Sequence, residues 1–128
     1  MPCATASMNG NSMMDFLKNY WPFFALGAWF LYKNLKSRQV VAMMPRLKEQ
    51  GAVLVDVRSP AEFSQGSAPG TVNIPLQDLG ARMAELPKNA PIVVGCASGS
   101  RSGMARMTLR RNGFARVYNI GAWTNFLR

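Results

Sequence analysis

The sequence predicts an α/β domain with a mainly parallel sheet flanked by helices, preceded by a hydrophobic N-terminal helix. Near-continuous apolar runs, rich in β-branched residues, occupy residues 52–57 and 91–96. Such runs are typical of parallel strands that are buried on both faces. Helical patterns alternate with these strands along the chain, which is the order expected of an α/β domain. A separate run dense in aromatic residues lies between residues 16 and 35.

Length and composition restrict the chemistry. A chain of 128 residues has room for one modest domain and a short additional segment. It contains no histidine and only two cysteines, Cys3 and Cys96, which excludes Ser-His-Asp and Cys-His catalysis and a thiolate zinc site. We therefore expect no metal and no organic cofactor, and chemistry that depends on a single thiol, hydroxyls, carboxylates, amines or backbone dipoles.

The chain is strongly basic, with a formal net charge of +9. Such a charge can serve nucleic-acid binding, solubility or attraction to anionic lipid. The sequence has no zinc-finger spacing, no basic-region heptad and no aromatic signature of an RNA-binding domain. We therefore expect no nucleic-acid partner.

The N-terminal part is expected to contain a disordered tail at residues 1–15 and a transmembrane helix at residues 16–35. The uncharged run at residues 19–32 is only about 21 Å long as a helix, short of the ~30 Å hydrocarbon core. Residues 16–35 reach about 30 Å, provided that Lys18 and Lys33 extend to the two membrane surfaces. A cleaved signal peptide, a helix lying in the membrane interface and a helix packed on the domain are the alternatives.

Basic residues follow this segment and set its expected orientation. The positive-inside rule predicts a single-pass protein with its catalytic domain on the cytoplasmic side. Membrane lipid is then a partner of residues 16–35, and a homodimer formed through that helix is a further expectation. Pro22 is expected near the start of the helix, where a missing N–H does least harm. The basic residues that set the expected orientation are Lys33, Lys36, Arg38, Arg46 and Lys48.

Residues 36–128 are expected to form the α/β domain. A capping box of Ser59 and Glu62, with Pro60 between them, predicts the start of a helix after the first strand. The remaining elements are expected in the order helix 45–50, strand 52–57, strand 71–74, helix 76–86, strand 91–96, helix 102–111, strand 115–120 and a last short helix from residue 122.

Cys96 lies where a buried strand gives way to a loop of small residues and then a helix. Backbone N–H groups converge in such a loop and the helix dipole adds positive charge, so a thiol there is favoured as a thiolate. Arg101 adds a permanent cation. The alternative is a buried, inert cysteine at a strand end. The predicted catalytic residues are Cys96 and Arg101, and the predicted substrate-binding residues are Ala97, Ser98, Gly99 and Ser100.

These segments resemble a single-domain rhodanese, a sulfurtransferase, over about residues 40–128. The resemblance implies a rhodanese-like fold, in which Cys96 takes a sulfane sulfur from thiosulfate or a persulfide donor and passes it to cyanide or a thiol. It also implies that residues 97–101 hold that sulfur. The matching segments are residues 53–63 (VLVDVRSPAEF), 66–75 (GSAPGTVNIP), 96–102 (CASGSRS) with the helix after it, and 117–123 (VYNIGAW).

The chain departs from the family pattern at two positions. Ser67 stands where the family often has histidine, and Gly121 stands alone where a Gly-Gly pair is usual. We expect neither departure to touch the cysteine loop. A non-catalytic binding module or a persulfide carrier tethered to the membrane is the alternative function.

The loop length separates two related chemistries. Cys96 to Arg101 is six residues, whereas the related phosphatase and arsenate-reductase family has seven, in a ring sized for a tetrahedral oxyanion. By analogy with these families, we expect sulfur transfer and poor phosphatase activity. Asp56, Arg58 and Glu62 are expected to be structural, with Asp56 accepting hydrogen bonds or pairing with an arginine.

Overall fold

The computed structural model describes residues 10–128, with side chains from residue 12 onward. The chain divides into two compact units, Met1–Tyr32 and Lys33–Arg128. Helix α1, Gly10–Glu49, contributes residues to both.

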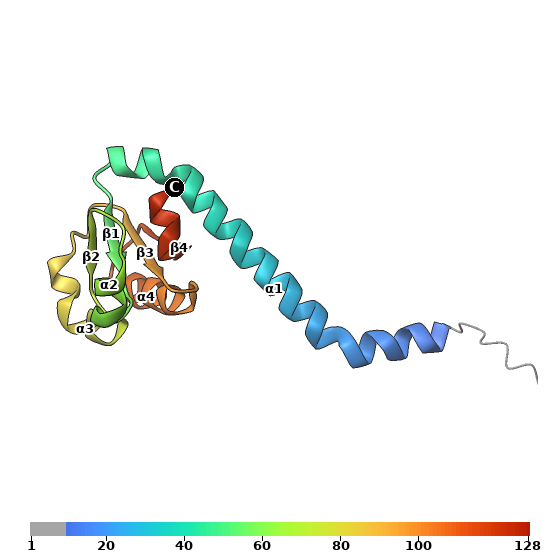
Figure 1. Cartoon of the computed structure of the whole chain (residues 1–128). Coiled ribbons are helices and arrows are strands. Elements are labelled where there is room, and N and C mark those ends of the chain that lie inside the picture. The colour runs from blue at the N-terminus through green and yellow to red at the C-terminus, as the bar shows by residue number, and fades with distance from the viewer. Residues whose placement is uncertain (1–9) are drawn as a thin grey trace, which may run out of the picture. The chain divides into compact units, whose positions relative to one another are not determined.

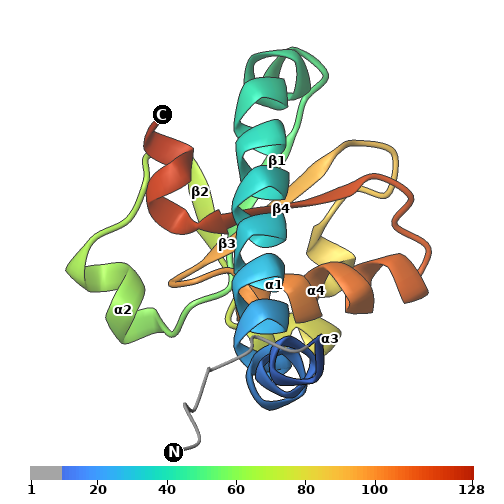
Figure 2. The same cartoon turned by 90° about the vertical axis from the view of Figure 1, so that its right-hand side faces the viewer.

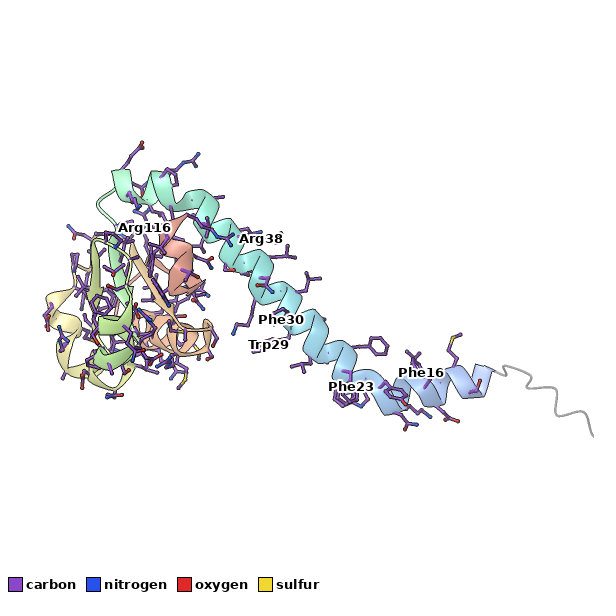
Figure 3. The ribbon with its side chains drawn as sticks, viewed as in Figure 1. Phe16, Phe23, Trp29, Phe30, Arg38 and Arg116 are labelled. Atoms are coloured by element: carbon purple, nitrogen blue, oxygen red, sulfur yellow. The ribbon has the colours of Figure 1, made fainter. Side chains whose placement is uncertain are left out.

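The first unit, as far as it is described, is helical and exposes its aromatic side chains. Phe16, Phe23, Trp29 and Phe30 project from α1 and are all more than half exposed (Figure 3). Within residues 10–128 we find no helix that is both long and apolar enough to cross a bilayer. Polar residues, including Lys18 and Lys33, lower the mean hydropathy of the predicted span, so a transmembrane helix at residues 16–35 is not supported. Lipid binding, a homodimer and a cytoplasmic domain stay predictions.

Helix α1 is longer than any N-terminal helix expected from the sequence. The predicted tail lies partly in residues 1–9, which are outside the described residues, and residues 10–15 already belong to α1. Pro22 therefore lies inside the helix rather than near its start. The predicted helix at residues 45–50 is the end of α1, because Val40, Met44 and Leu47 form one buried stripe at helical spacing.

The second unit is built on a four-stranded parallel sheet, which confirms the predicted α/β class. The strands are β1 (Val53–Asp56), β2 (Thr71–Asn73), β3 (Ile92–Cys96) and β4 (Val117–Ala122), in the spatial order β2-β1-β3-β4. Figures 1 and 2 show these strands side by side, with the helices α2 (Pro60–Gln65), α3 (Leu79–Arg82) and α4 (Ser100–Arg111) around them.

Both faces of the sheet are buried, which explains the near-continuous apolar strands. Val55 and Val94, paired across β1 and β3, pack with Leu109 of α4 on one face. Leu54 and Val93, also paired, pack on the other face with residues of α1 and with Phe126. Alternate residues of each strand therefore supply two separate cores.

Several element boundaries differ from the predicted ones. The helix predicted at residues 76–86 is three short pieces, η1 (Leu76–Asp78), α3 and η2 (Met83–Glu85). Helix α4 begins at Ser100, because Gly99 turns the chain directly into it. The last strand extends to Ala122, and the final helix is the 3₁₀ helix η3 (Trp123–Leu127).

Candidate active site

The structure places Cys96 at the carboxyl end of β3, a central strand of the sheet. Every residue of β3 is buried, and Cys96 itself has no exposed surface. Its side chain belongs to the core that also contains Val94 and Ala105. In the structure Cys96 therefore lies between a buried strand and a helix, as predicted.

The loop after Cys96 requires glycine at its last position. Gly99 has a φ of +97°, in the left-handed region that favours glycine, and a Cβ at this position would lie 3.1 Å from the Cα of Gly121. The close approach of these two backbones holds the loop against the end of β4, so the expectation that the departure at Gly121 does not touch the loop is wrong. With the loop held there, the Gly99 N–H donates a hydrogen bond to Cys96 Sγ over 2.9 Å. The other predicted substrate-binding residues, Ala97, Ser98 and Ser100, are exposed.

The environment of Sγ favours the thiolate. Burial raises the pKa of the Cys96 thiol, but hydrogen bonds from the Ser102 hydroxyl and from the backbone N–H groups of Ser102, Ser98 and Gly99 outweigh burial and leave it below its ordinary value. The converging N–H groups are those of the loop and of the first turn of α4. This arrangement can stabilise negative charge on a sulfur atom.

Arg101 does not direct its guanidinium to the sulfur as a hydrogen-bond donor. It forms two hydrogen bonds with the Glu62 carboxylate of α2, of 2.8 and 3.0 Å. This pairing, together with the Ser59 backbone N–H, lowers the pKa of Glu62 to about 2, and it raises the pKa of Arg101. Glu62 thus caps α2 and also positions the Arg101 cation beside the loop, a second role that the capping-box pattern did not predict.

The pairing expected for Asp56 is present. Asp56 has no exposed surface, and its two carboxylate oxygens share the Nε–H of Arg58, at 3.0 and 2.9 Å. Arg58 Nη2 also lies 2.8 Å from Asp56 Oδ2. Arg58 also donates to the carbonyl oxygen of Gly66 and lies over the ring of Trp123, 4.4 Å from its centroid. This buried pair connects the end of β1 to the chain segments after α2 and β4.

A polar network that the sequence pattern did not predict lies beside the thiol. Ser102 Oγ lies 3.4 Å from Cys96 Sγ and donates to Asn119 Oδ1 over 2.6 Å. The Asn119 amide in turn donates to the carbonyl oxygen of Gly99. Ser102 could have been found from its position on the first turn of the helix, but the contribution of Asn119, on β4, depends on the pairing of strands.

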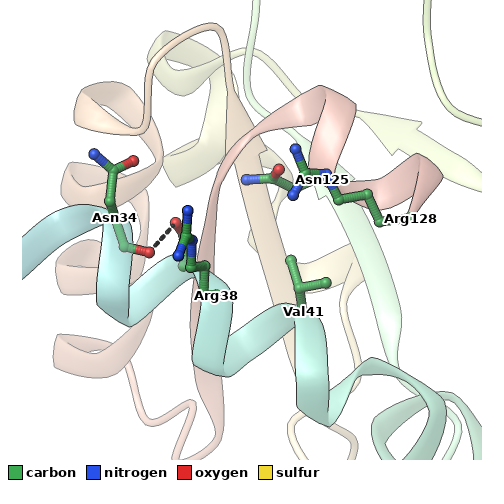
Figure 4. A pocket seen from close by; sticks show the side chains of 6 residues that line it. Asn34, Arg38, Val41, Asn125 and Arg128 are labelled. Carbon is green, nitrogen blue, oxygen red and sulfur yellow. Dashed lines mark hydrogen bonds between the residues drawn. The ribbon is translucent and has the colours of Figure 1, made fainter.

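A separate surface pocket lies between α1 and η3 of the second unit (Figure 4). Cys96 does not line this pocket, and none of the side chains that line it is acidic. The lining residues are Asn34, Ser37, Arg38, Val41, Asn125 and Arg128.

Comparisons with known proteins show which family this chain is similar to. The model of the rhodanese-like domain family matches residues 39–128. A thiosulfate sulfurtransferase, GlpE of Pseudomonas syringae, is 38% identical over 89 residues, which cover 70% of this chain and 80% of that protein. A protein named sulfurtransferase from Allochromatium vinosum is 39% identical over 71 residues, covering 56% of this chain and 66% of that protein.

Solved structures show the same relationship. A structure described as a rhodanese with anions from E. coli has a TM-score of 0.55 and 33% identity, and the match covers 58% of this chain and 89% of that one. The CoADR-RHD protein of Bacillus anthracis has a TM-score of 0.58 and 33% identity, but the match covers 68% of this chain and only 16% of that one. Because the family model matches the greater part of the sequence, including the sheet and the Cys96 loop, the chain belongs to the rhodanese-like family.

Proposed function

We propose that this protein is a sulfurtransferase in which Cys96 carries a sulfane sulfur as a persulfide. The environment of Sγ is the observation that supports this proposal most directly. The sulfur is buried, accepts the Gly99 N–H and lies beside the Ser102 hydroxyl, and these groups favour its anion. The relative named thiosulfate sulfurtransferase supports thiosulfate as a donor.

The proposed reaction has two steps. In the first, the Cys96 thiolate attacks the outer sulfur of thiosulfate, the S–S bond breaks and sulfite leaves with the bonding electron pair. In the second, cyanide or a thiolate attacks the outer sulfur of the persulfide and Cys96 leaves as a thiolate. We expect the N–H groups of the loop, from Ala97 to Ser100, to hold the anionic outer sulfur between these steps.

Arg101 supplies positive charge to both steps. Its ion pair with Glu62 fixes the guanidinium at the start of α4, beside the loop. From there it can attract an anionic donor and favour the thiolate without bonding directly to Sγ.

Intact-protein mass spectrometry tests this proposal. Incubation with thiosulfate should add one sulfur atom to the peptide that carries Cys96, and cyanide should remove it as thiocyanate. Cys96→Ser should abolish both, because a serine hydroxyl is not ionised at neutral pH and forms no persulfide. Cys3→Ser is the matched control and should load normally. Substantial thiocyanate formation by Cys96→Ser would contradict the proposal.

A persulfide carrier is the second candidate. A Bacillus subtilis relative named putative sulfur carrier protein YrkF is 40% identical over 67 residues, which cover 52% of this chain and 36% of that protein. A carrier would gain sulfur on Cys96 but would release it to a specific protein and not to cyanide. A non-catalytic binding module would gain no sulfur at all, so the same measurement separates the three functions.

A further inference from the structure

Ser102 has one proton and three acceptors within reach. Its hydroxyl lies 2.6 Å from Asn119 Oδ1, 3.0 Å from the carbonyl oxygen of Gly99 and 3.4 Å from Cys96 Sγ. A hydroxyl donates only one hydrogen bond at a time. Ser102 is fully buried, so water cannot replace a hydrogen bond that its hydroxyl does not make within the protein.

The two oxygen acceptors do not depend on the Ser102 proton. Asn119 Oδ1 also accepts the N–H of Gly121 over 2.9 Å. The carbonyl oxygen of Gly99 also accepts the N–H of Gly103 over 3.0 Å and the amide of Asn119 over 3.1 Å. The hydroxyl can therefore turn toward the sulfur without leaving either oxygen unpaired.

We propose that Ser102 is a two-position donor for the sulfur chemistry of Cys96, and that Asn119 holds its proton in the alternate position. When Cys96 is a thiol, its S–H donates to Ser102 Oγ and the hydroxyl proton points to Asn119 Oδ1. When Sγ is a thiolate, the hydroxyl turns and donates to it. In the persulfide, Sγ is neutral and the charge lies on the outer sulfur, so the hydroxyl returns to Asn119.

This inference rests on the proposed sulfurtransferase function and adds that Ser102 assists the step in which the persulfide is discharged. In the discharge step the acceptor forms a bond to the outer sulfur, the S–S bond breaks and its electron pair goes to Sγ. The Ser102 hydroxyl then turns to the newly formed thiolate, and no proton leaves the serine. Ser102 thus stabilises Cys96 as a leaving group, and a leaving thiol with a lower pKa departs faster.

The thiol pKa is the first measurement, because it needs no sulfur donor. Thiolate absorbance is followed against pH in the full chain carrying Cys3→Ser, so that Cys96 is the only thiol. Ser102→Ala should raise the thiol pKa by about one unit, since hydrogen bonds to charged groups are the stronger ones. Thr108→Ala is the control: Thr108 lies on the same helix and donates only to the carbonyl oxygen of Met104, so its loss should leave the pKa unchanged.

The charged side chains near the loop are the same in all these variants, so their contribution to the pKa cancels. In the second unit they are Arg101 and its partner Glu62, Asp56 and Arg58 at the end of β1, and Lys33 of α1, whose Cε lies beside Gly99.

Single-turnover kinetics separate a donor from a structural residue. Above the thiol pKa of both proteins, Ser102→Ala should load sulfur from thiosulfate at an undiminished rate and discharge it to cyanide on the order of three- to tenfold more slowly. A loosened loop would instead slow both steps, so equal slowing or an unchanged pKa would overturn the proposal.

Asn119→Ala gives a second test, which applies even if Ser102→Ala does not fold. It removes an acceptor that the hydroxyl needs only when Sγ is uncharged, so the thiol pKa should fall or stay the same, and a rise would overturn the proposal. A raised pKa in Ser102→Ala, in a protein that never gains sulfur from thiosulfate, would support the Ser102 donor and reject the sulfurtransferase.

Discussion

Replacing Gly99 with alanine should damage both the stability of the protein and its thiol. A non-glycine residue in the left-handed region costs about 1–2 kcal/mol. The new Cβ would also lie 3.1 Å from the Gly121 Cα, and overpacking of this kind adds about 1–3 kcal/mol. We therefore expect Gly99→Ala to lower the free energy of unfolding by about 2–5 kcal/mol.

The same substitution should impair loading of sulfur. Movement of the loop away from Gly121 would carry the Gly99 N–H away from Sγ, where it now donates over 2.9 Å. A hydrogen bond to a charged group contributes about 1.5–3 kcal/mol. At a pH below the thiol pKa, its loss corresponds to roughly a ten- to hundredfold smaller thiolate fraction and an equally slower persulfide formation.

Gly51→Ala separates the backbone cost of the left-handed conformation from the cost of the close contact with Gly121. Gly51 has a similar φ of +80°, but among the described residues no atom apart from those of its chain neighbours lies within 4 Å of the position that its Cβ would take. It should show only the backbone cost, measured by urea unfolding, and should load sulfur normally in mass-spectrometric time courses. If Gly99→Ala were as stable as Gly51→Ala and loaded at the same rate, the close approach to Gly121 would not position the thiol.

Two buried or partly buried ion pairs give further predictions. Asp56→Ala should lower the free energy of unfolding by about 3–5 kcal/mol, because it leaves the Arg58 guanidinium buried and unpaired. Arg82→Ala, which breaks the exposed pair with Glu85, is the urea-unfolding control and should cost less than about 1 kcal/mol. For Glu62, the folded pKa of about 2 lies below the ordinary value of 4.5, so its contribution to stability is complete above pH 4.5 and is lost as the pH falls through 2. Acid titration of Glu62→Gln should show a weaker loss of stability in this window than the parent protein, and identical titrations would argue against the Glu62–Arg101 pair.

Local chemistry made much of the fold predictable from the sequence. The β-branched runs around Val55 and Val94 predict buried parallel strands, because a strand covered on both faces has no polar side. Ser59 and Glu62 predict the start of α2, because a capping box is completed within one turn of chain. Cys96, followed by small residues and a helix, marks the site for the same reason: its strand, loop and helix are consecutive in sequence.

The tertiary structure decided the features that depend on residues far apart in the chain. Glu62 holds Arg101 because α2 and α4 approach one another, and Asn119 reaches Ser102 because β4 pairs with β3. The last turns of α1 pack against the sheet, which the aromatic run alone did not reveal. Sequence by itself determined most of the local elements and the position of the candidate thiol, whereas the partners that change the pKa of this thiol come from contacts that exist only once the parallel sheet has assembled.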